Sequence, residues 1–374
     1  MARNGDELRA LGTGKMPSFV FSNARPSSIP FFTFHDAEPE SFDRQLLHLK
    51  DNDYRTVGAD EAADGGPAEG RVALTFDDAT WTFWTYAYPL LRRRGMRAIL
   101  FVVPGVVRDG PNPRPTLEDV WSGRCSIDDV AEAGRQDPFC TWPEIARMHA
   151  SGSVDVQSHS LSHARVPVTP RVIDFVHPGF DGYAGGFDLP LTTAEPNAEG
   201  RREPRPGTPV FVSASRLSGR LRFREDPELV RAARAVAQEG GPSFFRRPGW
   251  RAALRRVVDG VPPPERGVYE DPVARETALR RELAESKRQI EARLQGHIVL
   301  QLAYPWHQGS NLADRLAAEA GYRTVLGGPA SPRDPPGASP RRIPRVPERY
   351  LLRLPGRGRV SLPAALAAGR RRRR

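Results

Sequence analysis

The sequence predicts an α/β fold built around a parallel sheet or barrel. Three short apolar runs have the length and composition of buried strands, at residues 72–76, 98–103 and 298–303. Segments with the period of an amphipathic helix lie around them, for example at residues 40–50 and 274–295. Because parallel strands need a crossover connection, which is usually helical, this alternation favours a parallel arrangement.

The first half of the chain supplies most of the expected elements. In order, we predict a strand at 29–34, a helix at 40–50, a short strand at 54–57, a loop or short helix at 59–70, a strand at 71–76, a crossover helix from 81 to the Arg94–Gly95 stop, a strand at 98–103, a long loop at 104–137, a helix at 142–151 and a strand at 154–158. Residues 1–28 lack periodicity and are expected to form a loosely ordered lead-in.

The alternation breaks after residue 163. Residues 164–267 are rich in Pro, Gly and Arg, with one expected strand at 209–212 and one expected helix at 227–239. A structureless loop of this length inside a compact domain would be unusual, so we predict an inserted subdomain. The pattern then resumes with a helix at 274–295, a strand at 298–303, a helix at 311–321 and a strand at 324–326.

These changes of pattern divide the chain into five parts. They are a lead-in at 1–28, the first part of the main domain at 29–163, the insertion at 164–267, the second part of the main domain at 268–327, and a Pro- and Arg-rich tail at 328–374. We expect the tail to follow the surface.

Composition narrows the class of protein. The chain has no run of 18 apolar residues and no apolar N-terminal segment, so neither a transmembrane helix nor a signal peptide is predicted, and a cytoplasmic location is expected. Cys125 and Cys140 lack metal-ligand spacing and are expected to be free thiols. Arg370–Arg374 supply five charges of the net +10, so we expect weak contact with an anionic surface there. No basic stripe with interleaved aromatics occurs, so sequence-specific nucleic-acid binding is not expected.

Two adjacent carboxylates end the strand at 71–76. Asp77 and Asp78 lie at the carboxyl end of that strand, the edge where α/β proteins build their sites. Adjacent residues there point to opposite sides, so one acid could bind a cation while the other addresses what that cation activates. An Asx turn or a helix N-cap is the alternative interpretation of the same pair.

A pair of histidines follows another strand. His159 and His163 lie four residues apart just after the strand at 154–158, and one helical turn would place both imidazoles on the same side. Two neutral imidazoles and a carboxylate make a three-ligand site with open positions, as a catalytic divalent metal needs. The sequence therefore predicts a metal site.

These motifs together resemble the polysaccharide deacetylase family (NodB-homology, like carbohydrate esterase family four). The resemblance rests on Thr75-Phe-Asp-Asp78, His159-Ser-Leu-Ser-His163, Leu302-Ala-Tyr-Pro-Trp306 and Ala317–Arg323. It covers residues 30–165 and 275–327 and implies an irregular parallel (β/α) barrel, which this chain would interrupt with a large insertion after the second motif. It also implies metal-dependent removal of an acetyl group, N-deacetylation first, from a sugar, polysaccharide or glycan precursor. Asp77 would be the general base, and Asp78, His159 and His163 the metal ligands.

The insertion is one departure from the family pattern. It replaces a short connection and leaves directly from the two histidines, so it would border the pocket. Asp174, His177 and Asp181 within it are candidates for substrate contact, with a solvated loop as the alternative.

The proton donor is a second departure. Many family members take this acid from a Leu-x-His motif near the C-terminus, and no histidine follows His307 in this chain. His35, which ends the first strand, and His307 are the remaining candidates. We favour His35.

The rest of the predicted site comes from residues 304–306. A backbone N–H there would share the charge of the oxyanion with the metal. Tyr304 or Trp306 would stack on a sugar ring, with core packing as the alternative for each. The ligand set suits Zn²⁺ first, with Co²⁺, Ni²⁺, Mn²⁺ and Fe²⁺ as alternatives. Two other functions fit the same residues: hydrolysis of cyclic amides or ureides on this fold, and carbohydrate binding without catalysis.

Overall fold

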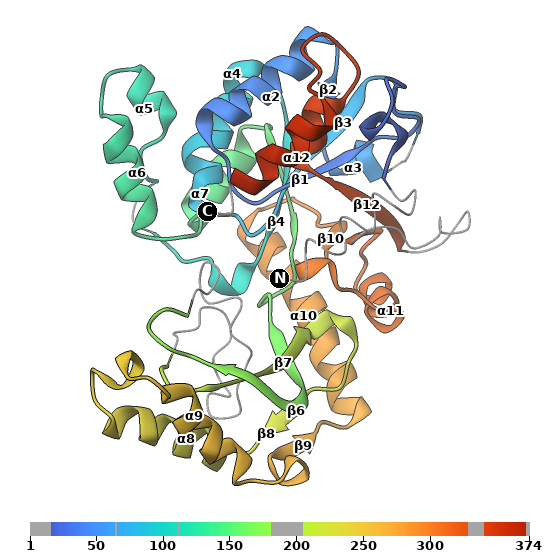
Figure 1. The fold of residues 1–374 in the computed structure, drawn as a ribbon. Coiled ribbons are helices and arrows are strands. Elements are labelled where there is room, and N and C mark those ends of the chain that lie inside the picture. The colour runs from blue at the N-terminus through green and yellow to red at the C-terminus, as the bar shows by residue number, and fades with distance from the viewer. Residues whose placement is uncertain (1–15, 64–65, 111–112, 181–204, 328–339, 372–374) are drawn as a thin grey trace.

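A barrel of parallel strands forms the upper part of the molecule (Figure 1). The structure is a computed structural model that describes residues 16–63, 66–110, 113–180, 205–327 and 340–371. The barrel strands are β1 (Phe31–Phe34), β3 (Arg71–Phe76), β4 (Ala98–Val102), β5 (Val154–Ser158), β10 (Gln301–Ala303), β11 (Thr324–Gly327) and β12 (Arg341–Pro347).

The barrel is closed, because β1 pairs on one side with β12 and on the other with β3. The order around the ring is β1–β12–β11–β10–β5–β4–β3, and all of these pairings are parallel. It is irregular, since β5 and β10 meet only at Ser158 and Leu302, and the short β2 (Arg55–Thr56) pairs with the start of β3. The predicted irregular parallel (β/α) barrel is confirmed.

Alternation along β3 decides which side chains enter the barrel. Val72, Leu74 and Phe76 are fully buried in the large core between barrel and helices. Ala73 belongs instead to a small inner cluster, with residues such as Phe101 from other strands. Because side chains alternate, the residue after Phe76 faces the barrel's interior at its carboxyl end. That residue is an aspartate, so the apolar filling of the barrel ends in a carboxylate.

Helices cover the outside of the barrel in Figure 1. They are α2 (Pro39–Asp51), α3 (Ala59–Ala63), α4 (Tyr88–Arg94), α7 (Trp142–Ala150), α10 (Pro272–Arg293), α11 (Asn311–Glu319) and α12 (Leu362–Arg371). The crossover after β3 begins as a π-helical turn, η2 (Phe83–Ala87), and continues as α4. It ends at Gly95, whose φ of 66° is left-handed, as predicted for a glycine stop.

The prediction of a long loop at 104–137 is wrong in part. The segment contains two short helices, α5 (Leu117–Trp121) and α6 (Ile127–Arg135). Each begins with a capping box, formed by Thr116 with Asp119 and by Ser126 with Asp129. The reciprocal bonds satisfy N–H groups that a short helix leaves open, so local polar contacts define both starts.

The chain between β5 and α10 forms the lower part of Figure 1. Its elements are β6 (Arg165–Phe175), β7 (Pro209–Ser215), β8 (Phe223–Glu225), α8 (Pro227–Glu239), α9 (Trp250–Asp259) and β9 (Gly267–Tyr269). β6 pairs with β7 and β8 with β9, both antiparallel, and the sheets and helices share their own apolar cluster. The expected strand and α8 are present, whereas β6, β8, β9 and α9 escaped the sequence analysis.

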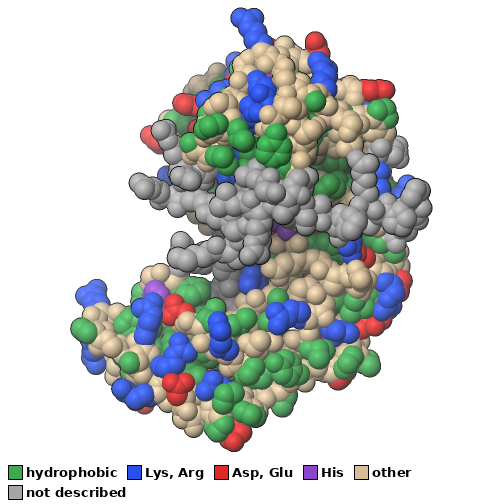
Figure 2. All heavy atoms as spheres, turned by 45° about the vertical axis from the view of Figure 1, so that its right-hand side comes forward, with side chains coloured by type: hydrophobic (Ala, Val, Ile, Leu, Met, Phe, Trp, Pro, Cys, Tyr) green, Lys and Arg blue, Asp and Glu red, His purple; other side chains and the backbone are tan. Residues whose placement is uncertain are grey.

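The surface of this lower part is mixed in charge. On the face shown in Figure 2, Lys and Arg side chains lie among Asp and Glu side chains. Among the described residues, no helix is both long and apolar enough to cross a membrane. Arg370–Arg374, expected to contact an anionic surface, have side chains outside the described residues. Cys125 and Cys140 are free thiols, as predicted.

The C-terminal part is not a surface tail, so that prediction is wrong. β12 completes the barrel between β1 and β11, and η9 (Glu348–Arg353) follows it with Tyr350 fully buried. Pro344 and Pro347 hid this strand, because proline cannot donate to a ladder and argues against a central strand.

Part of the expected lead-in is also ordered. Residues 1–15 lie outside the described residues, but Phe19 and Val20 are fully buried in a short 3₁₀ turn, η1 (Ser18–Val20). Arg353 Nε donates to the Val20 carbonyl at 2.9 Å. Segments near the two ends of the described chain are therefore bonded to each other.

Removing residues 340–374 should abolish cooperative folding, because the loss of β12 opens the ring and exposes the edges of β1 and β11. Removing residues 362–374 deletes only α12, which is anchored through Ala365 and partly buried leucines, so a cooperative transition should persist. Thermal unfolding followed by circular dichroism compares the two. A cooperative transition in the variant that lacks residues 340–374 would contradict the role given to β12.

Candidate active site

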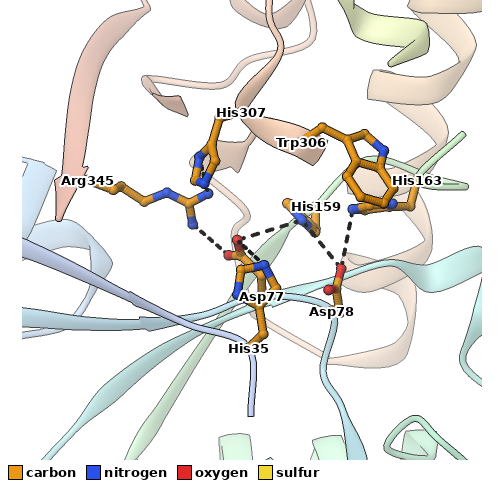
Figure 3. Close-up of a pocket in the computed structure, with 8 residues that line it drawn as sticks. All are labelled: His35, Asp77, Asp78, His159, His163, Trp306, His307 and Arg345. Atoms are coloured by element: carbon orange, nitrogen blue, oxygen red, sulfur yellow. Dashed lines mark hydrogen bonds and ion pairs between the residues drawn. The ribbon is translucent and has the colours of Figure 1, made fainter. Parts of the chain in front are cut away.

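A pocket opens at the carboxyl end of the barrel, and five strands deliver its lining (Figure 3). Its residues are His35 after β1, Asp77 and Asp78 after β3, His159 and His163 after β5, Trp306 and His307 after β10, and Arg345 within β12. All of the predicted catalytic and metal residues therefore meet in one place.

Asp78, His159 and His163 have the geometry of a metal site. Asp78 Oδ1 lies 3.5 Å from His159 Nε2 and 3.4 Å from His163 Nε2, and all three residues are buried. Ligands at about 2.1 Å from a common ion in a tetrahedral arrangement are about 3.4 Å apart, so these spacings match. The residues present fit a divalent cation with an open position.

His159 is prepared to act as a neutral ligand. Its Nδ1–H donates to the Ala303 carbonyl at 2.8 Å, which leaves the lone pair of Nε2 facing Asp78. Burial lowers the pKa of His159 to about 4, although the nearby Asp77 carboxylate acts in the opposite direction. The ring is therefore neutral at physiological pH, as metal binding requires.

The loop between the two histidines is not helical, so the expected helical turn is wrong. Ser160 and His163 have φ of 66° and 52°, and the loop N–H groups bond outside a helical ladder. His159 N–H donates to Val102, Ser160 N–H to Ser158 Oγ, Leu161 N–H and Ser162 N–H to Glu282, and His163 N–H to Ser160 Oγ. Because every one of these donors has an acceptor, the loop is fixed in a shape that brings both rings together.

Asp77 is held by an arginine that the sequence analysis missed. Arg345 NH1 donates to Asp77 Oδ1 at 2.6 Å, and both side chains are almost fully buried. Burial favours the neutral acid, but the Arg345 guanidinium, with His159 and His35, outweighs it and holds the pKa of Asp77 well below its usual range. Asp77 is therefore a carboxylate, and its Oδ2 is 3.9 Å from both His35 Nε2 and His159 Nε2.

His35 reaches the pocket from a tightly bonded turn. Thr80 Oγ1 donates to the His35 carbonyl at 2.9 Å and lies 2.9 Å from Thr82 Oγ1. The Thr82 hydroxyl donates to Asp36 Oδ1 at 3.0 Å and accepts from the Ala37 N–H at 3.2 Å. These bonds join the loop after β3 to the loop after β1. The His35 side chain is 29% exposed, so its imidazole is open to a substrate.

Trp306 and His307 form the opposite wall of the pocket. The Trp306 ring meets His163 edge to face at 4.9 Å, and the Arg165 guanidinium lies 4.9 Å from the Trp306 ring centroid. Arg165 is the first residue of β6, so the chain that follows the histidines supports this wall. His307 Nδ1 lies 3.1 Å from Arg345 NH2.

Tyr304 does not belong to this wall. It is 3% exposed, and its hydroxyl donates to Asp314 Oδ1 at 2.6 Å, on the outside of the barrel. The prediction that Tyr304 stacks on a sugar is therefore wrong. Its backbone N–H donates to Leu326 and Pro305 has none, so Trp306 is the remaining oxyanion candidate within residues 304–306.

Backbone strain is concentrated in the site. In the part of the chain that the structure describes, eight non-glycine residues have positive φ, and six of them lie in the pocket loops. The six are Asp78, Ala79, Ser160, His163, Trp306 and His307. Such conformations cost about 1–3 kcal/mol each and persist only where surrounding contacts determine them. The loops are thus held in positions that their own propensities do not favour.

Two of the candidates in the insertion, Asp174 and His177, contact Arg251. Asp174 accepts from Arg251 Nε at 3.1 Å, and His177 Nε2 lies 3.3 Å from Arg251 NH2. Neither lines the pocket, so a substrate contact for them stays a prediction. Asp181 lies outside the described residues.

The fold and the site define a parallel barrel with a candidate metal centre at its carboxyl end. Residues 64–175, which contain both aspartates and both histidines, match the family model for polysaccharide deacetylase. The resemblance drawn from the motifs is therefore confirmed.

Individual relatives are distant. YxkH of Bacillus subtilis (strain 168), which bears the name polysaccharide deacetylase, is 29% identical over 92 residues, or 21% of this chain. The match spans about a third (33%) of the length of that relative.

Several solved structures are similar at low identity. The de-N-acetylase from Aggregatibacter actinomycetemcomitans has a TM-score of 0.47 and 13% identity, over 91% of this chain and 99% of its own. The deacetylase domain of BpsB from Bordetella bronchiseptica has a TM-score of 0.46 and 16% identity, over 86% and 96% of the two chains. IcaB from Ammonifex degensii has a TM-score of 0.44 and 18% identity, over 92% and 97%. The barrel itself is defined by the strand order given above.

Replacing Asp78, His159 or His163 singly with Ala should abolish stoichiometric binding of a divalent cation, because each removes one of three converging ligands. Elemental analysis after dialysis against Zn²⁺ measures the bound metal. His307→Ala is the matched control, since it removes a pocket histidine outside the ligand group. Equal metal content in all four variants would contradict the assignment.

Proposed function

We propose that this protein hydrolyses the N-acetyl group of an acetylated carbohydrate with the help of a divalent metal. The observation that carries the proposal is the juxtaposition of the Asp77 carboxylate with the Asp78–His159–His163 group in one pocket. A binding protein has no need for a buried proton acceptor beside a metal site. The family model that matches residues 64–175 supports the same class of reaction.

The metal would be held by Asp78, His159 and His163. A divalent cation there supplies Lewis acidity, which acidifies water and polarises a carbonyl group. One carboxylate and two imidazoles suit Zn²⁺, and also Co²⁺, Ni²⁺, Mn²⁺ or Fe²⁺.

Asp77 is placed to accept a proton as general base. Its Oδ1 is engaged by Arg345, whereas its Oδ2 faces His35 and His159 across the pocket. A water molecule that attacks the acetyl carbonyl would transfer its proton to Oδ2. Arg345 keeps Asp77 ionised before the reaction and fixes the orientation of the carboxylate.

His35 is better suited than His307 to donate a proton to the leaving amine. An arginine can only donate, so Arg345 NH2 approaches the lone pair of His307 Nδ1. A second proton on His307 would thus be placed beside a guanidinium charge. His35 Nε2 instead lies 3.9 Å from the Asp77 carboxylate, a negative charge rather than a positive one. Trp306 lines the same pocket, and a sugar ring would stack on it.

Asp77→Asn should lower the rate of acetate release by about 10²–10⁴, because the amide cannot accept the proton. Metal content should be unchanged, since Asp77 is not one of the ligands. Acetate release from N-acetylated chito-oligosaccharides, measured with the metal-loaded protein, is the assay. Ring opening of a cyclic ureide by the wild type, without acetate release, would support the rival hydrolase. Sugar binding without either reaction would support a binding protein.

His35→Ala and His307→Ala separate the two proton donors. The first should lower kcat by about 10²–10⁴ with metal content intact, and the second should have a much smaller effect. The same acetate assay and elemental analysis measure both. A large loss confined to His307→Ala would reverse the assignment.

A further inference from the structure

The helix α10, which lies outside the pocket, forms hydrogen bonds with the loop at residues 159–163 that carries both histidine ligands. α10 presents Glu282 to this loop, and both carboxylate oxygens are used. Ser162 N–H donates to Oε2 at 3.1 Å, and the Ser162 hydroxyl donates to Oε1 at 2.5 Å. The Leu161 N–H donates to the main-chain carbonyl of the same Glu282 at 3.2 Å.

The next turn of α10 continues this contact. Ser286 is fully buried, and its hydroxyl lies 2.8 Å from Ser158 Oγ, at the end of β5. Ser158 Oγ in turn accepts from the Ser160 N–H at 3.3 Å. The helix therefore contacts the loop through polar groups at both of its ends.

A third element, the turn after β4, also bonds to the loop. The Gly105 N–H donates to the Leu161 carbonyl at 2.9 Å, and a Cβ added at Gly105 would lie 2.6 Å from that oxygen. Leu161 is thus held between Gly105 and α10.

We propose that Glu282 is a positioning residue for the metal centre, and that its two carboxylate oxygens set the affinity for the cation. Ser162 is 1% exposed and directly precedes His163, whose backbone is left-handed at φ 52°. Two donors of Ser162 need two acceptor oxygens, which a carboxylate supplies. Without them, the buried N–H and hydroxyl would be drawn to other partners, and His163 would turn away from Asp78.

The inference rests on the metal site of the proposed function, but its test needs no substrate. Zn²⁺ affinity is measured by competition with a chelator, and the visible absorption of bound Co²⁺ reports the ligand geometry. Glu282→Ala should weaken Zn²⁺ binding about 10–100-fold and alter the Co²⁺ spectrum, as removal of outer-shell partners does. Glu282→Gln retains one acceptor oxygen, so its affinity for Zn²⁺ should lie between those of the wild type and Glu282→Ala.

Glu285→Ala is the matched control. Glu285 lies on the same helix but pairs with Arg288 and Gln289, so its loss should leave metal affinity unchanged. Ser162→Ala keeps the N–H and removes the hydroxyl, so it provides a milder variant if Glu282→Ala does not fold. Combined with Glu282→Ala, it should add no further loss of affinity, because both act through one contact.

Two results would overturn the proposal. One is unchanged Zn²⁺ affinity and Co²⁺ spectrum in Glu282→Ala, with only the melting temperature lowered. The other is equal weakening by Glu282→Ala and Glu285→Ala. A wild type that binds Zn²⁺ but releases no acetate would refute the proposed deacetylation and leave this test intact.

Discussion

Two adjacent carboxylates buried at the end of β3 are the constraint on which the rest of the structure depends. Asp77 and Asp78 are 2% and 1% exposed, and burying an uncompensated charge is costly. Arg345 supplies the charge for Asp77 at 2.6 Å, and Asp78 faces two imidazoles at the spacing of a metal centre. Arg345 lies on β12, the strand that closes the barrel. The same strand therefore completes the fold and supplies the positive charge that balances the buried Asp77 carboxylate.

The pocket loops combine strain with dense hydrogen bonding. Residues such as Ser160 and His163 adopt left-handed backbones, which would relax in an isolated loop. In the loop at residues 159–163 every N–H has an acceptor, and both α10 and Gly105 bond to this loop. The barrel thus supplies the rigidity, and the bonded loops supply the ligand directions that a metal requires.

The chain that departs from the barrel after His163 stays attached to the pocket. Arg165 opens β6, bonds to Ser213 of β7 and lies against Trp306. The Ser215 N–H donates to Gln308 at 2.9 Å, just beyond the Trp306 turn. The lower part of the molecule is therefore fastened to the wall of the pocket that carries Trp306.

The sequence by itself determined the barrel strands other than β12 and the residues at their tips. Apolar runs ending in Asp77, Asp78 and His159 are local patterns, and parallel strands bring their carboxyl ends to one edge. Only the tertiary structure decided that Arg345 faces Asp77, because a strand containing Pro344 has no local signature and is defined by its neighbours β1 and β11. It also decided that the Tyr304 hydroxyl bonds to Asp314 while Trp306 lines the pocket, because the left-handed backbone at Trp306 has no local signal in the sequence. The spacing of His159 and His163 suggested a helical turn, whereas long-range bonds hold the loop in another shape: Glu282 bonds to Leu161 and Ser162, and the His159 ring donates to the Ala303 carbonyl.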